Sequence, residues 1–229
     1  MMVTGNLDIA LLELFNGSGS SFWDALMLTL TSGYTWIALY VALLYLVISN
    51  SETMAHIILV AGCAILCVVL AGGLCDYVVK PLVERVRPIN DYALRGVIVS
   101  ACEIRPKDFS FFSSHAANTM SIAIFFSLLV RNTRLFVALL FWSLTNCYTR
   151  LYLGLHYPSD IVVGLLWGTT VGVAVYYIYT RLYTKICSYG EYISTQYTSK
   201  GYTIVTIDIV VMILVLSYIF SILRAFIVA

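Results

Sequence analysis

Long apolar runs separated by short polar links dominate the chain and predict an all-α fold. Five of these runs come close to or exceed the roughly 18–25 residues of a membrane-spanning helix, and they cover residues 53–79, 114–130, 135–153, 158–183 and 203–223. A further apolar stretch, residues 21–49, is interrupted at Ser32 and Gly33. It fits either one long tilted helix or an interfacial piece followed by a spanning helix. The pattern therefore predicts an integral membrane bundle of about six transmembrane helices.

The N-terminal residues carry a weaker, shorter pattern. Residues 7–15 alternate apolar side chains with Asp8 and Glu13, as expected of a short amphipathic helix. Such a helix is too short to span a bilayer and favours the membrane surface. We expect residues 1–33 to form an interfacial N-terminal segment of a single membrane domain that comprises residues 1–229.

Composition supports a membrane protein. Hydrophobic residues make up 61% of the chain and charged residues 11%, whereas soluble domains carry about 25% charged residues. The net charge of +1 argues against nucleic acid as a partner, because nucleic-acid binding needs a basic face. The six Cys form no C-x-x-C pair, which favours small buried residues over a disulfide framework or a zinc site.

One charged stretch interrupts the apolar pattern. Residues 80–110 must lie outside the hydrocarbon or line a wet cavity, because charges are costly within a bilayer. Asp76 lies one helical turn before Lys80, so we expect the two side chains to pair. Four further basic residues fit two interpretations equally well, contact with an anionic headgroup or simple solvation: Arg85, Arg95, Arg105 and Lys107.

A second polar stretch, residues 149–160, places an Arg, a His and an Asp between two apolar runs. Gly154 is a typical end for one helix, and Pro158 is a typical first residue for the next. Asp160 then lies in the first turn of that helix and can reach back towards His156. A carboxylate behind an imidazole fixes its tautomer and makes it a better nucleophile or base.

Three polar clusters share one face of the membrane, because successive helices alternate in direction. The clusters cover residues 80–88, 112–115 and 149–160, and among their side chains they offer the cations Lys80, Arg87 and Arg150, the histidines His115 and His156, the serines Ser113 and Ser114, and the acid Asp160. A phosphate ester site needs these groups: cations neutralise the oxygens, a nucleophile attacks phosphorus and an acid protonates the leaving oxygen.

In order, these clusters read K-x6-R-P, S-x-H and R-x5-H-x3-D, a pattern that resembles the type 2 phosphatidic acid phosphatase (PAP2) superfamily. That superfamily also contains bacterial acid phosphatases and vanadium haloperoxidases. The match covers residues 80–160, about a third of the chain. Phe112 and Ser114 replace the usual Pro and Gly of the second motif, and Thr149 replaces the Ser that usually opens the third. None of these changes removes a reacting group.

The resemblance implies a role for each motif residue. His156 would be the nucleophile that forms a phosphohistidine, Asp160 would hold and polarise it, and His115 would protonate the leaving group and then activate water. The phosphate would be bound by Lys80, Arg87, Arg150, Ser113 and the backbone amide of Ser114. The family uses no metal, so we expect neither a metal site nor a cofactor.

The expected function is that of an integral membrane lipid phosphatase. Its substrate would be a lipid A phosphate or undecaprenyl diphosphate, with phosphatidylglycerol phosphate and phosphatidic acid as further candidates. Two other classes fit parts of the pattern: a vanadate-dependent haloperoxidase, and a non-catalytic protein that binds or transports lipid phosphates. The acid-free link at residues 131–134 indicates a cytoplasmic side. We therefore expect a bacterial inner membrane protein with its site on the periplasmic face.

Overall fold

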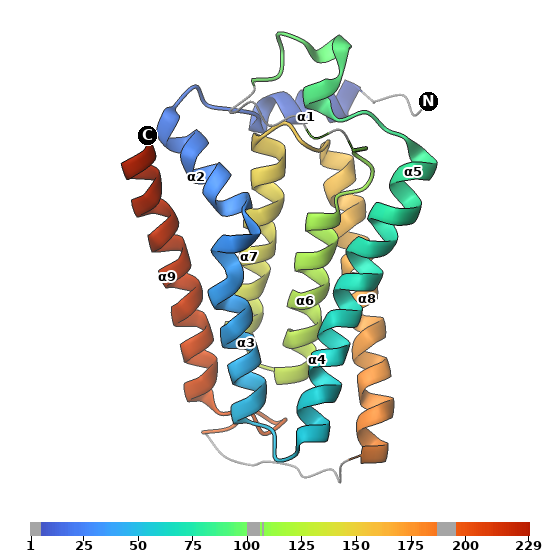
Figure 1. Ribbon diagram of the computed structural model, residues 1–229, viewed down its shortest axis with the longest axis vertical. Coiled ribbons are helices and arrows are strands. Elements are labelled where there is room, and N and C mark those ends of the chain that lie inside the picture. Colours follow the sequence, from blue (N-terminus) through green and yellow to red (C-terminus); the bar gives the residue numbers. More distant parts are fainter. Residues whose placement is uncertain (1–5, 100–105, 107, 187–195) are drawn as a thin grey trace.

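The computed structural model describes residues 6–99, 106, 108–186 and 196–229 (Figure 1). The regular structure of this part of the chain is helical apart from one isolated bridge, Tyr197–Thr203, which confirms the all-α fold. The α-helices are α1 (Asn6–Phe15), α2 (Ser21–Thr31), α3 (Ile37–Ser49), α4 (Met54–Val68), α5 (Lys80–Val83), α6 (Ser114–Val130), α7 (Thr133–Tyr152), α8 (Pro158–Ile186) and α9 (Ile204–Val228).

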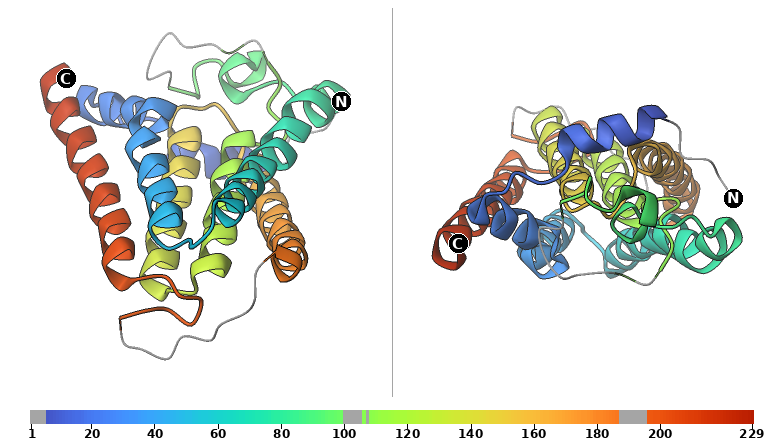
Figure 2. Two further views of the ribbon diagram at one scale, coloured as in Figure 1. Left: turned by 60° about the horizontal axis from the view of Figure 1, so that its bottom comes forward. Right: turned by 90° about the horizontal axis from the view of Figure 1, so that it is seen from above.

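The long helices lie side by side, and α1 lies across one end of the bundle (Figures 1 and 2). The loop that follows α5 and the link between α7 and α8 are at this same end (Figure 1). The charged stretch and the His-containing link therefore share one face, as the alternation of helix directions predicts. We call this face the site end of the bundle.

The interrupted stretch at residues 21–49 forms a bent pair of helices. α2 and α3 meet at 63°, and a 3-10 turn, Gly33–Trp36, connects them. One long straight helix is therefore excluded, and the break lies at the predicted position. α2 packs against α7 and α9 and buries Leu26, Met27 and Leu30.

The helix that begins with α4 continues beyond its predicted end at residue 79. Two π-helical segments, Val69–Gly73 and Cys75–Val79, connect α4 to α5. Lys80 consequently lies on a helical turn, where its Nζ is 2.7 Å from Asp76 Oδ1. This confirms the predicted Asp76–Lys80 pair. Glu84, with φ of 50°, ends α5 in the left-handed region and redirects the chain.

α6 and α8 approach closely along a stripe of small residues. A Cβ on Gly164 would lie 2.7 Å from the Ser113 carbonyl oxygen, and one on Gly172 would lie 2.8 Å from the Ser121 carbonyl oxygen. Glycine at these positions lets the two backbones touch, as in small-residue packing of membrane helices. The stripe fixes the start of α6 against the start of α8, where the predicted site residues lie.

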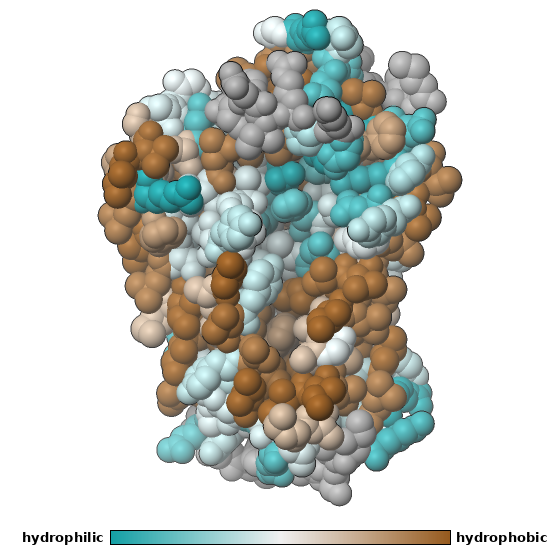
Figure 3. All heavy atoms as spheres, in the orientation of Figure 1, coloured by the Kyte–Doolittle hydropathy of each residue, from teal (hydrophilic) through white to brown (hydrophobic). Residues whose placement is uncertain are grey.

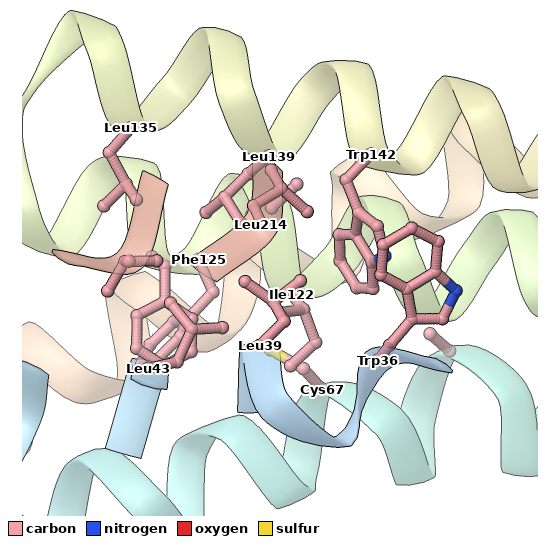
Figure 4. Close-up of a cluster of buried hydrophobic side chains, with 14 of the residues drawn as sticks. Trp36, Leu39, Leu43, Cys67, Ile122, Phe125, Leu135, Leu139, Trp142 and Leu214 are labelled. Carbon is pink, nitrogen blue, oxygen red and sulfur yellow. The ribbon is translucent and has the colours of Figure 1, made fainter. Parts of the chain in front are cut away.

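The core and the lipid-facing surface are both apolar. Figure 4 shows Trp36 and Trp142 facing each other beside a layer of Leu and Phe side chains, with ring centroids 6.0 Å apart. In Figure 3, apolar side chains form much of the middle and lower part of the visible face, above a polar lower rim, and further polar ones gather towards the site end. Three described helices are long and apolar enough to cross a membrane, or four with the bent pair. The count of six stays a prediction, because α6 has only 17 residues and α7 is not among the helices that meet this criterion.

Candidate active site

Two predicted phosphate-binding cations converge on one carboxylate. Lys80 and Arg87 are both buried. Arg87 Nη2 lies 2.5 Å from Asp108 Oδ2, and Lys80 Nζ lies 3.4 Å from the same oxygen. Arg87 Nε also donates to the Asp108 carbonyl oxygen at 3.1 Å. The two cations therefore face one small volume, which an anionic oxygen of the chain itself occupies.

Asp108 is not among the predicted site residues. Its burial disfavours the charged form, but the hydrogen bond and charge of Arg87, together with the charge of Lys80, outweigh this effect. The pKa of Asp108 is therefore held below its usual value, and the group is an anion at neutral pH. Its side chain is half-exposed, so it occupies the open side of the cation pair.

His156 lies next to Arg87 and is 1% exposed. Arg87 Nη1 donates to the Leu155 carbonyl oxygen at 3.0 Å and lies 3.3 Å from His156 Nε2. The other ring nitrogen, Nδ1, is 3.6 Å from Asp160 Oδ2. We assign the proton to Nδ1, because it faces a carboxylate while Nε2 faces a cation. Nε2 then carries a lone pair that accepts the hydrogen bond from Arg87 Nη1.

The local fold of this link follows the sequence prediction. α7 ends at Tyr152, and Gly154 adopts a φ of 64°, a left-handed conformation that favours glycine. Pro158 begins α8. The imidazole of His156 is buried between the two helix ends. Burial, assisted by the charges of Arg150 and Arg87 and opposed by Asp160, lowers the pKa of His156 to about 4.

Asp160 is fully buried, and three segments of the chain hold it. Its Oδ1 accepts a hydrogen bond from Arg85 Nη1 at 2.6 Å. Its Oδ2 accepts hydrogen bonds from the Ser110 hydroxyl and from the Tyr157 amide, the latter at 3.0 Å. The Ser113 amide donates to the Asp160 carbonyl oxygen at 3.2 Å. These contacts fix the carboxylate behind the imidazole.

The sequence led us to expect that Arg85 is either solvated or in contact with a lipid headgroup. The structure shows neither. The Arg85 guanidinium is buried, bonded to Asp160, and paired with Asp8 of α1 at 2.7 Å. Ser110 also lies outside the predicted set. No local pattern marks either residue, because Arg85 is 75 positions and Ser110 is 50 positions from Asp160.

The second motif lies at the start of α6. Ser113 is the N-cap of this helix, and its Oγ accepts from the Ala116 amide at 3.4 Å, which leaves its O–H free to donate. The Ser114 amide belongs to the first turn, whose amides lack partners within the helix. His115 is exposed and lies close enough to Lys80, Arg87 and Arg150 to feel their charges. Cys75 Sγ donates to the Phe112 carbonyl oxygen at 3.0 Å and thereby tethers the altered motif to the extended α4 helix.

Arg150 approaches from the last turn of α7. Its guanidinium is buried, and its Nη1 donates to Thr31 Oγ1 at 2.7 Å. Its Nε has no hydrogen-bond partner within the described residues. The structure therefore brings all eight predicted site residues to the site end. An arrangement of this kind can bind a tetrahedral anion and present a neutral imidazole to it.

Metal ligands do not cluster in the part of the chain that the structure describes, since no group of three or more His, Cys, Asp or Glu there could hold an ion. Four Cys are buried there, as predicted: Cys63, Cys67, Cys75 and Cys147. The other two, Cys102 and Cys187, lie outside the described residues. Metal independence stays a prediction.

Known proteins are similar to this chain over most of its length. The family model described as the PAP2 superfamily matches residues 61–184. A lipid A 4'-phosphatase of Bacteroides thetaiotaomicron is 36% identical over 184 residues, which cover 80% of this chain and 81% of the relative. A lipid A 4'-phosphatase of Porphyromonas gingivalis is 28% identical, covering 72% of this chain and 71% of the relative. Undecaprenyl-diphosphatase BcrC of Bacillus subtilis is 26% identical, covering 67% and 73%. No solved structure matches this chain.

Proposed function

The chain belongs to the PAP2 superfamily and is a membrane lipid phosphatase; from this premise we propose that it removes a phosphate group from lipid A through a phosphohistidine on His156. Two relatives named as lipid A 4'-phosphatases support this substrate, and both are more similar to the chain than BcrC is. Undecaprenyl diphosphate is the alternative substrate. The proposal rests above all on the geometry of His156, whose Nε2 lies 3.3 Å from Nη1 of Arg87, one of the two cations that meet at Asp108.

Substrate binding begins with exchange of one anion for another. The phosphate of the lipid enters between Lys80 and Arg87 and displaces the Asp108 carboxylate, which already lies between these cations. Arg150 and the first-turn groups of α6, the Ser113 hydroxyl and Ser114 amide, bind the remaining oxygens. Arginine suits this task because its planar fork matches phosphate oxygens.

The chemistry then proceeds in two displacements. Nε2 of His156 attacks phosphorus, and the bond from phosphorus to the sugar oxygen breaks while His115 donates a proton to that oxygen. Asp160 stabilises the cationic ring through Nδ1–H. In the second step His115 removes a proton from water, the water oxygen attacks phosphorus, and the N–P bond breaks to release inorganic phosphate.

The bilayer-facing surface of the fold supports a lipid substrate. A groove of about 190 Å³ lies between α3 and α4, lined by apolar side chains that include Leu43, Val60 and Phe126. α6 forms part of this groove and carries His115 at its start. The acyl chains can therefore remain in the hydrocarbon while the headgroup reaches the site end from the side. We place the site end on the periplasmic face of a bacterial inner membrane, because the opposite end carries the short basic link at residues 131–134.

The proposal is tested by phosphate release from purified protein in detergent. The panel contains lipid A with both phosphates, lipid A lacking either the 1- or the 4'-phosphate, undecaprenyl diphosphate, phosphatidylglycerol phosphate and phosphatidic acid. We expect the highest kcat/KM with a lipid A phosphate, and mass spectrometry identifies which phosphate is lost. A higher kcat/KM with undecaprenyl diphosphate would show that this lipid, and not lipid A, is the preferred substrate.

The covalent intermediate needs a separate experiment. Rapid quenching with labelled substrate should trap acid-labile, base-stable phosphate on the wild-type protein and none on His156→Ala. Label retained by the variant would refute the phosphohistidine. Turnover should also persist in excess chelator, and its loss in chelator with recovery on adding a divalent ion would contradict metal independence.

A further inference from the structure

The N-terminal helix contacts Arg85 and Ser159, which adjoin the predicted catalytic residue Asp160, although the helix lies outside residues 61–184, which match the family. Asp8 of α1 is largely buried, and its Oδ2 lies 2.7 Å from Arg85 Nη2. The same carboxylate accepts hydrogen bonds from both donors of Ser159: the amide at 2.9 Å and the hydroxyl at 2.5 Å. Asp8 therefore holds both Arg85 and the first turn of α8.

Arg85 connects Asp8 to Asp160. Its Nη1 donates to Asp160 Oδ1 at 2.6 Å and to Ser159 Oγ at 2.8 Å, and its Cζ lies 4.0 Å from the centroid of the Tyr157 ring. The guanidinium is buried between two carboxylates, so its position depends on both. The order of contacts is His156, Asp160, Arg85 and Asp8.

We propose that Asp8 is a positioning residue for the phosphatase reaction: through Arg85 it fixes the carboxylate of Asp160 behind His156. This inference rests on the proposed function. Without the Asp8 charge, Arg85 has Asp160 as its one anionic partner and draws Oδ1 towards itself. Asp160 Oδ2 already lies 3.6 Å from His156 Nδ1, longer than a hydrogen bond. A carboxylate drawn further away stabilises the cationic ring less, so the chemical step slows.

The rest of α1 has its own attachment to the bundle, so the charge of Asp8 can be removed without releasing the helix. The Asn16 side chain donates to the Tyr152 carbonyl oxygen at 2.8 Å and accepts from the Val99 amide at 2.7 Å. Leu12 is fully buried. Glu13 lies on the same helix but is exposed, so Glu13→Gln is a matched control for loss of one negative charge.

The first test compares kinetic parameters on the best substrate of the panel. Asp8→Asn should lower kcat by roughly 10- to 100-fold, the size typical of groups that orient a reacting residue. KM should remain within about twofold, because Asp8 does not contact the phosphate site. Asp8→Glu should recover part of kcat, and Glu13→Gln should match wild type. An unchanged kcat in Asp8→Asn, or a loss confined to KM, would overturn the inference.

The second test separates positioning from a general structural role. If Asp8 acts through Asp160, Asp8→Asn should cause no further loss of kcat in an Asp160→Asn background. If the fold-losses of kcat in the two single variants multiply in the double variant, Asp8 acts on a group other than Asp160. A wild-type protein that releases no phosphate from any lipid of the panel would refute the proposed function itself. Active wild type with an equally active Asp8→Asn would refute this inference alone.

Discussion

The two ends of the bundle carry the same kinds of side chain in different surroundings. At the site end, buried His156 lies between Arg87 and Asp160. At the opposite end, His56 is also buried, but its Nε2 lies 2.9 Å from the neutral hydroxyl of Tyr179. Both histidines are buried, yet of the two only His156 has charged groups on two sides.

The ion pairs at the two ends differ in the same way. The Arg85 and Asp160 side chains are 7% and 0% exposed, whereas those of Arg134 and Asp208 are 67% and 51% exposed. A buried charge is costly unless it is paired, and removing its partner leaves it uncompensated. An exposed pair contributes little. The buried charges at the site end therefore depend on one another, whereas the Arg134–Asp208 pair at the opposite end is screened by water.

Replacing each histidine is the strongest test of this contrast. His156→Gln should lower phosphate release by roughly 10⁴-fold, because the nucleophile is lost. His56→Gln should stay within about twofold, because its neutral contact lies at the other end of the bundle. Both rates are measured on the best lipid substrate with the two variants folded in the same detergent. If His156→Gln releases phosphate at a rate near that of wild type, His156 is not the nucleophile and the two histidines do not differ in catalysis.

Replacing one arginine at each end tests the difference in stability. Arg85→Met leaves Asp8 and Asp160 buried without their cation and should cost about 3 kcal/mol or more. Arg134→Met breaks a pair that is mostly exposed and should cost less than about 1 kcal/mol. Thermal unfolding in detergent measures both. Equal shifts in the two variants would mean that burial does not distinguish these pairs.

The helix boundaries and motif residues that could be predicted depend on residues close together in the sequence. The end of α7 and the start of α8 followed from Gly154 and Pro158, and the start of α6 followed from the apolar run at residues 114–130, because these signals are local. The motif residues were found from their spacing. All of them lie at the site end because the helices alternate in direction.

Contacts between distant segments were not predictable in this way. Asp8, Arg85 and Ser110 reach the site only after the chain has folded, and no local pattern identifies any of the three as a site residue. The helix that contains Lys80 continued beyond its predicted end because Lys80 and Pro81 can occupy the first positions of a helical turn. The Gly164, Gly168 and Gly172 spacing could have indicated the close α6–α8 packing.

Acidification should destabilise the site end through His156. Its pKa is about 4 in the fold, against the ordinary 6.5, so below pH 6.5 the unfolded chain binds a proton that the folded chain does not. The stability from the neutral ring is thus present above about pH 6.5 and lost as the pH falls towards 4. Between pH 7 and pH 5 the loss should be about 2 kcal/mol. His156→Asn should show a smaller dependence in thermal unfolding, and identical slopes would contradict the low pKa.

Replacing Asp108 tests whether Lys80 and Arg87 are available to bind a phosphate or serve only to pair with this carboxylate. Its carboxylate lies between Lys80 and Arg87 and must leave before a phosphate can bind there. Asp108→Asn should therefore tighten inhibition by inorganic phosphate, by roughly three- to tenfold, because one charge-assisted contact no longer competes. Glu13→Gln removes a charge from the same end without touching the cations and should leave the inhibition constant unchanged. Weaker inhibition in Asp108→Asn would mean that this carboxylate holds the cations in place for the phosphate rather than competing with it.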